Sequence, residues 1–129
     1  MIGKTLAHYE ITGQLGKGGM GEVYRARDTK LDREVAIKVL PREMSGDPER
    51  LARFVREART LATLQDSNVA SIYGFDDGDG VRFLVLELVE GEDLSERLQQ
   101  GPLPLDEAID IARQIAAGLE AAHDQGIVH

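Results

Sequence analysis

The chain contains the glycine-rich run Gly16-Lys17-Gly18-Gly19-Met20-Gly21-Glu22-Val23, and on both sides of it apolar and polar side chains alternate. Alternation with a period of two is typical of β-strands, so residues 9–15 and 22–27 are predicted to be strands. A dinucleotide-binding fold needs a helix directly after its glycines, because the helix N-terminus meets the pyrophosphate. The second strand therefore makes a dinucleotide-dependent oxidoreductase a poor reading. The glycine run is instead predicted to form a hairpin loop whose backbone, bare of side chains, can approach phosphate oxygens closely. An ordinary glycine-rich hairpin fits the run equally well.

The segment after this hairpin predicts a third strand that carries an unusual lysine. Residues 34–40 alternate between two largely apolar sides, and Lys38 lies on the same side as the small residue Ala36. An amine among apolar neighbours needs an anion, either a phosphate or a carboxylate, because an unpaired buried charge costs much free energy. The alternative is a lysine at the edge of the sheet that extends its amine into water.

A helix is predicted from about Pro48 to Gln65, and it supplies a candidate partner for the lysine. Asp47 is a typical N-cap residue, and proline is favoured at the first helical position. Apolar residues then recur at helical spacing, with Glu57 at the edge of their arc. The Glu57 carboxylate is the predicted partner of Lys38, and the alternative is a surface pair with Arg53.

The remaining segments complete an α+β prediction. Residues 69–75 and 81–86 are strand-like and are joined by a glycine-containing turn at 76–80. A short helix over 94–100 and a long one over 105–125 follow. The prediction is a five-stranded antiparallel sheet with one long helix packed on it, followed by a short and a long helix, with a boundary near Gly91.

Composition and charge narrow the possible functions. The 129 residues are 42% hydrophobic and 29% charged, as in a soluble globular protein, and a net charge of −8 argues against a general nucleic-acid binder. The absence of cysteine excludes a disulfide scaffold and a thiol nucleophile and suits a reducing cytoplasm. No apolar run is long enough to cross a bilayer, so no membrane partner is expected for this segment. Residues 1–59 carry a net charge of +3 and residues 60–129 one of −11, so the first half is where an anionic ligand would bind if there is one, although charge alone favours two solvated surfaces.

Taken together, these motifs resemble the eukaryotic-type protein kinases, and specifically their bacterial serine/threonine branch. The glycine run, the strand Val35-Ala36-Ile37-Lys38 and Glu57 occur in the family's order and spacing, as do residues 84–91 and the tail 121–129. One departure is Asp66-Ser67-Asn68, where such kinases usually have a His-Pro pair. The resemblance implies that residues 1–90 form the N-lobe of a kinase and that residues 91–129 form the hinge exit and the first helices of a truncated C-lobe.

The resemblance also implies a set of contacts with ATP. Lys38 would contact the α- and β-phosphates and be held in place by Glu57. The glycine loop, with Gly16, Gly18 and Gly21, would cover the triphosphate, and Leu15, Val23 and Ala36 would sandwich the adenine ring. Leu86 would be the gatekeeper, and the hinge backbone at Glu87 and Val89 would bond to the adenine edge. Asp93 would be the acid that binds the ribose.

The same resemblance sets expectations for activity. The last residue, His129, matches the histidine that opens the family's catalytic loop, so the catalytic base and the magnesium ligands are not among these 129 residues. The parent protein is expected to transfer the γ-phosphate of ATP, with Mg²⁺, to serine or threonine of a protein substrate. The 129-residue chain alone is expected to be inactive and to bind ATP weakly or not at all. The alternative is a naturally truncated, non-catalytic scaffold or regulatory module.

The long last helix is expected to mediate self-association. In a whole kinase its apolar stripe, which includes Ile111, Ile115 and Leu119, would be covered by the large lobe. Exposed apolar patches of this kind tend to find partners, so a homodimer or a higher oligomer is predicted.

Overall fold

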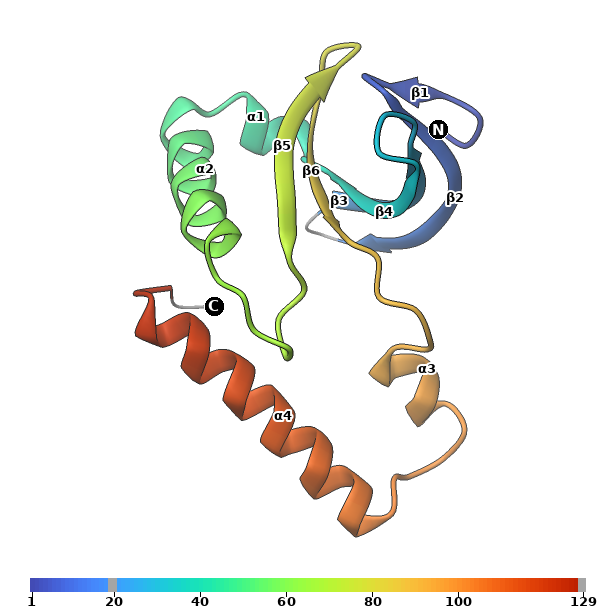
Figure 1. Ribbon diagram of the computed structural model, residues 1–129, viewed down its shortest axis with the longest axis vertical. Helices are drawn as coiled ribbons and strands as arrows, with labels where there is room; N and C mark the ends of the chain where they lie inside the picture. The colour runs from blue at the N-terminus through green and yellow to red at the C-terminus, as the bar shows by residue number, and fades with distance from the viewer. Residues whose placement is uncertain (19–20, 128–129) are drawn as a thin grey trace.

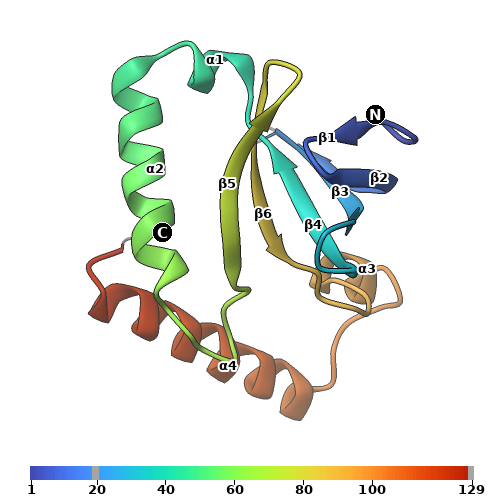
Figure 2. The same cartoon turned by 45° about the horizontal axis from the view of Figure 1, so that its top comes forward.

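A computed structural model of the chain describes residues 1–18 and 21–127. The elements are β1 Thr5–Leu6, β2 Tyr9–Gly18, β3 Gly21–Asp28, β4 Arg33–Val39, α1 Arg42–Ser45, α2 Pro48–Ala62, β5 Ile72–Gly78, β6 Val81–Glu87, α3 Leu94–Leu98 and α4 Leu105–Asp124. The strands form one antiparallel sheet in the order β1-β2-β3-β4-β6-β5. Helix α2 lies beside β5, and α4 runs below both of them (Figures 1 and 2). The predicted α+β class is confirmed.

The structure differs from the prediction mainly at the ends of elements. The described sheet has six strands where five were predicted, because β1 is too short to produce an alternating pattern and exists only through its pairing with β2. Strand β5 begins at Ile72, three residues later than predicted, and α2 ends at Ala62. The Thr63 hydroxyl donates to the Thr60 carbonyl at 2.8 Å, so a side chain takes over a backbone acceptor where the helix ends. The predicted cap of α2 is present, since Asp47 accepts from the backbone N–H groups of Glu49 and Arg50.

The hydrophobic core lies on one face of the sheet, on the inner side of its curl. Strand β4 contributes Val35 and Ile37, which are fully buried, from the centre of the sheet. The other buried members come from β1, β2, β3 and β6: Leu6, Tyr9, Ile11, Tyr24, Ala26, Phe83 and Val85. Because side chains alternate along a strand, burying this set on one face leaves Ala36 and Lys38 of β4 on the opposite face.

The curl of the sheet brings its two edges close together. A Cβ atom at Gly78, at the end of β5, would lie 2.8 Å from the backbone nitrogen of Ala7, beside β1. Any side chain at Gly78 would therefore collide with backbone, which explains the glycine. The turn that follows consists of Asp79 and Gly80, both with positive φ, as a type I′ hairpin turn requires.

A buried carboxylate, Asp28, closes the turn between β3 and β4. Its Oδ1 accepts the backbone N–H groups of Lys30 at 2.9 Å and Leu31 at 3.0 Å, and it lies 3.3 Å from the His8 Nε2. Burial alone would raise the pKa of the Asp28 carboxyl. The two N–H donors, with the charges of His8 and Arg33, outweigh burial and hold this pKa below its ordinary value.

We predict that Asp28→Ala lowers the free energy of unfolding by about 1–3 kcal/mol at pH 7, because the backbone N–H groups of Lys30 and Leu31 lose the buried carboxylate that accepts from them. The pKa of Asp28 is lower in the folded state than in the unfolded chain, so at a pH between these two pKa values the folded state binds fewer protons. The contribution of the Asp28 charge is therefore complete above the ordinary carboxyl pKa and is lost as the pH falls through the lowered one. Asp28→Asn should remove that part of the acid sensitivity.

Urea unfolding at pH 7 and at pH 3 measures both effects, with the exposed Asp77→Ala as the matched control. Equal losses for Asp28→Ala and Asp77→Ala would contradict the assigned role of Asp28.

Candidate functional site

Four of the predicted nucleotide-contacting side chains share one face of the sheet, opposite the hydrophobic core. In the antiparallel register, Lys38 of β4 pairs with Val23 of β3 and with Leu84 of β6. Two residues along, Ala36 pairs with Arg25 and with Leu86. Directly paired residues point to the same side of a sheet. Val23, Ala36, Lys38 and Leu86 are therefore neighbours on one surface.

The glycine hairpin lies at the end of β2 and β3, next to this surface. Gly16 pairs with Val23, and Gly18 pairs with Gly21, so the run continues as strand on both sides, as predicted. Gly19 and Met20, at the tip, lie outside the described residues. A Cβ atom at Gly16 would meet no protein atom within 4 Å, so packing does not explain the glycine. Leu15 lies at an irregularity in the β2–β3 pairing and is 47% exposed.

Lys38 and Glu57 do not form the predicted ion pair. Ion pairs within residues 1–18 and 21–127 join other partners, so the Lys38 amine and the Glu57 carboxylate lie more than 4.0 Å apart. Lys38 is half-buried, whereas Glu57, predicted at the edge of the buried arc of α2, is exposed. Glu57 instead lines a cavity with residues of α4, including Gly118 and Leu119.

The topology nevertheless places both residues on the same side of the sheet. Leu84, the β6 partner of Lys38, pairs in turn with Phe75 of β5. The Phe75 ring lies 6.4 Å from the ring of Phe54 on α2, so α2 packs against the face that carries Lys38. Ala58 is the buried residue of α2, and the side chain of Glu57, about 100° away around the helix axis, is exposed.

The last residue of β6 makes polar contacts with the α2–β5 loop. The backbone N–H of Glu87 donates to the Ser71 carbonyl at 2.8 Å, and Glu87 Oε1 accepts from the Ser71 N–H at 3.0 Å. The Glu87 N–H is thus occupied by the protein itself. Val89 is 67% exposed, and its backbone enters none of the hydrogen bonds that join described residues in turns and loops.

The predicted ribose-binding acid, Asp93, serves as the N-cap of α3. Its Oδ1 accepts from the backbone N–H of Glu96 at 2.7 Å, and the Glu96 carboxylate accepts from the Asp93 N–H. This reciprocal capping box uses one carboxylate oxygen of Asp93, and the residue is otherwise exposed to solvent.

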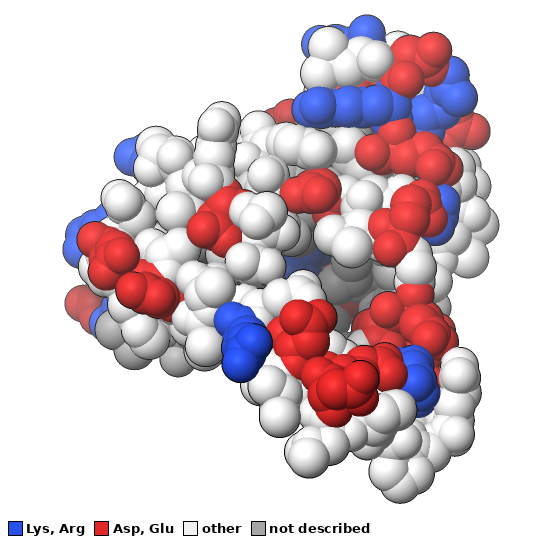
Figure 3. All heavy atoms as spheres, turned by 60° about the horizontal axis from the view of Figure 1, so that its bottom comes forward, with Lys and Arg blue, Asp and Glu red and all other residues white. Residues whose placement is uncertain are grey.

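An arginine crosses from the sheet to the segment after β6. The Arg25 guanidinium lies 3.3 Å from the Glu34 carboxylate and 3.5 Å from that of Glu90. The negative charge of the neighbouring Glu90 carboxylate raises the pKa of Arg25. Acidic side chains otherwise predominate around the hollow on the face below the sheet (Figure 3), in keeping with the acidic balance of residues 60–129.

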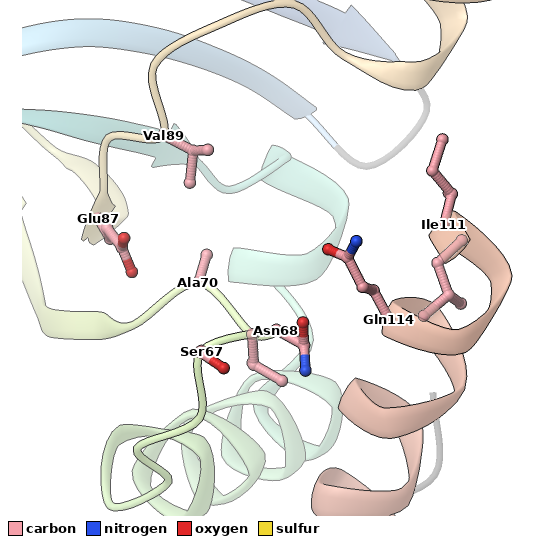
Figure 4. A pocket seen from close by; sticks show the side chains of 9 residues that line it. Ser67, Asn68, Ala70, Glu87, Val89, Ile111 and Gln114 are labelled. Atoms are coloured by element: carbon pink, nitrogen blue, oxygen red, sulfur yellow. The ribbon is translucent and has the colours of Figure 1, made fainter. Parts of the chain in front are cut away.

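Helix α4 approaches the α2–β5 loop at Gly118, a glycine that the sequence analysis did not single out. A Cβ atom at Gly118 would lie 2.8 Å from the carbonyl oxygen of Asn68, in the α2–β5 loop. The only hint in the sequence was a glycine inside an otherwise regular helical pattern, where it costs about 1 kcal/mol relative to alanine. Between this contact and the β6 exit lies a cavity of about 360 Å³, with Glu87 and Gln114 on opposite sides (Figure 4).

The apolar stripe of α4 is only partly covered. Ile115 is 51% exposed and Leu119 38%, as expected from the sequence, whereas Ile111 is half-buried beside the cavity. No helix in the described part of the chain has the length and hydropathy needed to cross a bilayer. Nor do three or more His, Cys, Asp or Glu side chains come together among residues 1–18 and 21–127 as a metal ion would require.

Comparison with known proteins gives a consistent family. The family described as "Protein kinase domain" matches residues 9–129. Serine/threonine-protein kinase PknE of Mycobacterium bovis is 41% identical over 128 residues, which are 98% of this chain and 23% of that protein. Serine/threonine-protein kinase PrkC of Bacillus subtilis is 42% identical over 131 residues, covering 100% of this chain and 20% of that protein.

Solved structures agree with the sequence relatives. The crystal structure of the Mycobacterium tuberculosis PknI kinase domain superimposes with a TM-score of 0.84 at 30% identity, covering 100% of this chain and 53% of that one. The chain therefore spans about a fifth of the curated relatives and about half of the solved domain.

We predict that Gly118→Ala lowers the free energy of unfolding by about 1–3 kcal/mol, because the added methyl group forces α4 away from the Asn68 carbonyl. This loss should exceed the gain of about 1 kcal/mol that alanine brings to a helix interior. Urea unfolding followed by circular dichroism measures it. The exposed neighbour Ala117→Ser is the control and should change stability by no more than about 0.5 kcal/mol. A stabilised Gly118→Ala variant would show that the contact does not constrain α4.

Proposed function

This chain belongs to the protein kinase domain family, and we propose that it forms the ATP-binding lobe of a serine/threonine protein kinase of the bacterial type. Its curated relatives are serine/threonine-protein kinases, and the match extends over nearly the whole chain. On this proposal the parent protein transfers the γ-phosphate of ATP to serine or threonine of a protein substrate.

One observation carries the proposal: the shared sheet face of Val23, Ala36, Lys38 and Leu86. The small side chain of Ala36 leaves room for a flat ring between β3, β4 and β6, and Lys38 brings a positive charge to the end nearer the glycine hairpin. Gly16 adds a stretch of backbone that no protein atom crowds, so a phosphate group can approach it closely. An adenine ring and a triphosphate fit this order of apolar, cationic and bare-backbone surfaces.

The backbone after β6 offers the polar contacts that an adenine edge requires. The Glu87 N–H is already paired with Ser71, so we assign the adenine contacts to the Glu87 carbonyl and to the backbone of Val89. Leu15, which is exposed, would close the slot from the β2 side. Asp93 would offer the ribose the carboxylate oxygen that does not cap α3.

The catalytic roles of Lys38 and Glu57 require a movement of α2. Phosphate binding by Lys38 needs only the sheet, but support by Glu57 needs its exposed carboxylate to turn toward β4. Mg²⁺ would supply charge neutralisation at the phosphates, and we assign it no ligand from these 129 residues. No residue of the chain is assigned as catalytic base, so we propose that the chain alone does not transfer phosphate.

We predict that ATP binds this chain with a dissociation constant in the millimolar range. Titration with Mg²⁺-ATP, followed by amide chemical shifts, should move resonances of Val23, Ala36, Leu86 and Val89, and Lys38→Met should weaken binding by about tenfold through loss of a charged contact. Arg113→Met, an exposed charge on α4, is the control. Shifts confined to other surfaces, or none at about tenfold excess over the expected constant, would contradict the nucleotide site. Magnesium-dependent phosphate transfer that Lys38→Met abolishes would contradict the proposed inactivity.

We further propose that the chain self-associates through α4. Ile115 and Leu119 present apolar surface that a second copy can bury. Sedimentation equilibrium should give a mass above that of the monomer, and Ile115→Asp should return it to 14.1 kDa. Arg113→Asp, on the same helix, serves as the control for added negative charge. A monomer at high concentration would rule this assembly out.

A further inference from the structure

Among the described residues, a single arginine provides the ion pair that connects the sheet to the segment leaving it. The other ion pairs in residues 1–18 and 21–127 join neighbours within the sheet region, His8–Asp28 and Arg27–Asp32, or within the helical region, Arg97–Glu107. Arg25 instead joins β3 to Glu90, 65 positions further along the chain. The Arg25–Glu90 pair therefore constrains how residues 91–127 are oriented relative to the sheet.

The geometry of this pair favours an orienting role. The two terminal nitrogens of Arg25 donate to the two carboxylate oxygens of Glu90, each at 3.5 Å, which is a bidentate arrangement. Nη1 of Arg25 also donates to Glu34 at 3.3 Å, so the guanidinium is held from the sheet side as well. Isolated exposed pairs contribute little, but bidentate geometry and shared charges are the conditions under which they matter.

The backbone between β6 and Glu90 has freedom that such a pair would restrict. Val89 is 67% exposed, and its backbone enters none of the hydrogen bonds that join described residues in turns and loops. Glu90 follows Val89 directly, and α3 and α4 come after Glu90. Rotation of the backbone at Val89 would therefore move Glu90 and the helical segment relative to the sheet, and the pair of Glu90 with Arg25 opposes that rotation. Further along the same segment, α4 approaches the α2–β5 loop at Gly118 and Asn68.

We propose that Arg25 and Glu90 form a clasp across the mouth of the nucleotide slot, with Arg25 as a positioning residue. Arg25 pairs directly with Ala36, so the clasp lies beside the surface assigned to adenine. Closing the clasp holds the helical segment near the sheet, and opening it widens the mouth. This consequence for nucleotide exchange rests on the proposed function, whereas the clasp itself does not.

The test measures the opening directly and without nucleotide. The chain has no cysteine, so spin labels can be placed only where they are introduced, at the exposed positions Lys30→Cys and Arg113→Cys. Electron–electron resonance then gives the distance distribution between sheet and α4. We expect one dominant distance, and we expect Arg25→Ala and Glu90→Gln to raise the share of longer distances by about threefold to fivefold, the effect of a favourable exposed pair. High salt should also raise the share of longer distances in the spin-labelled chain that keeps both Arg25 and Glu90, because salt screens the attraction between their charges.

Two further variants separate the clasp from general effects on the fold. Glu34→Gln removes the other carboxylate beside Arg25 and should leave the distribution unchanged. The swap R25E/E90R keeps an arginine between two carboxylates and should restore the dominant distance. An unchanged distribution in Arg25→Ala, equal changes in Arg25→Ala and Glu34→Gln, or no rescue by the swap would overturn the clasp. These outcomes leave ATP binding untouched, and a failure to bind ATP would leave the clasp standing.

Discussion

The central antiparallel pairing of β4 with β3 and β6 determines the rest of this structure. Its register brings Val23, Lys38 and Leu84 into one row and Arg25, Ala36 and Leu86 into the next. A slip of β4 by one residue would transfer Ala36 and Lys38 to the core face and move Val35 and Ile37 out of the core. The burial of those two residues therefore fixes the site as well as the core.

This division of the sheet explains why one short strand contributes both to the core and to the candidate site. The core face of β4 is filled by side chains from the neighbouring strands, and they leave it no room for a ligand. The opposite face has small or aliphatic residues around a half-buried amine, and α2 approaches it through Phe54 and Phe75. A lysine in such surroundings, without an ion-pair partner in the described part of the chain, favours an anion, which agrees with the family to which the chain belongs.

The helical segment is attached to this sheet by few but specific contacts. Ser71 fixes the start of the exit from β6 through two hydrogen bonds with Glu87, Arg25 holds Glu90, and Gly118 lets α4 approach Asn68. The loop that contains Asn68 lacks the His-Pro pair usual in similar kinases. In its place, the backbone of Asn68 lies close to Gly118 of α4. Because each attachment involves one or two residues, the orientation of the helices is set by local chemistry more than by a large apolar interface.

Patterns confined to a few neighbouring residues were enough to predict the glycine hairpin, the two-sided strand β4 and the Asp47 cap of α2, since each depends on local alternation or capping chemistry. Strand β1, the contact of Gly118 with Asn68 and the pairing of Arg25 with Glu90 were missed, because they join residues whose proximity arises only when the sheet curls and the chain returns. The expected pair between Lys38 and Glu57 failed for a related reason: the sequence places both on the correct elements, but the packing of α2 on β5 sets the distance between their charges.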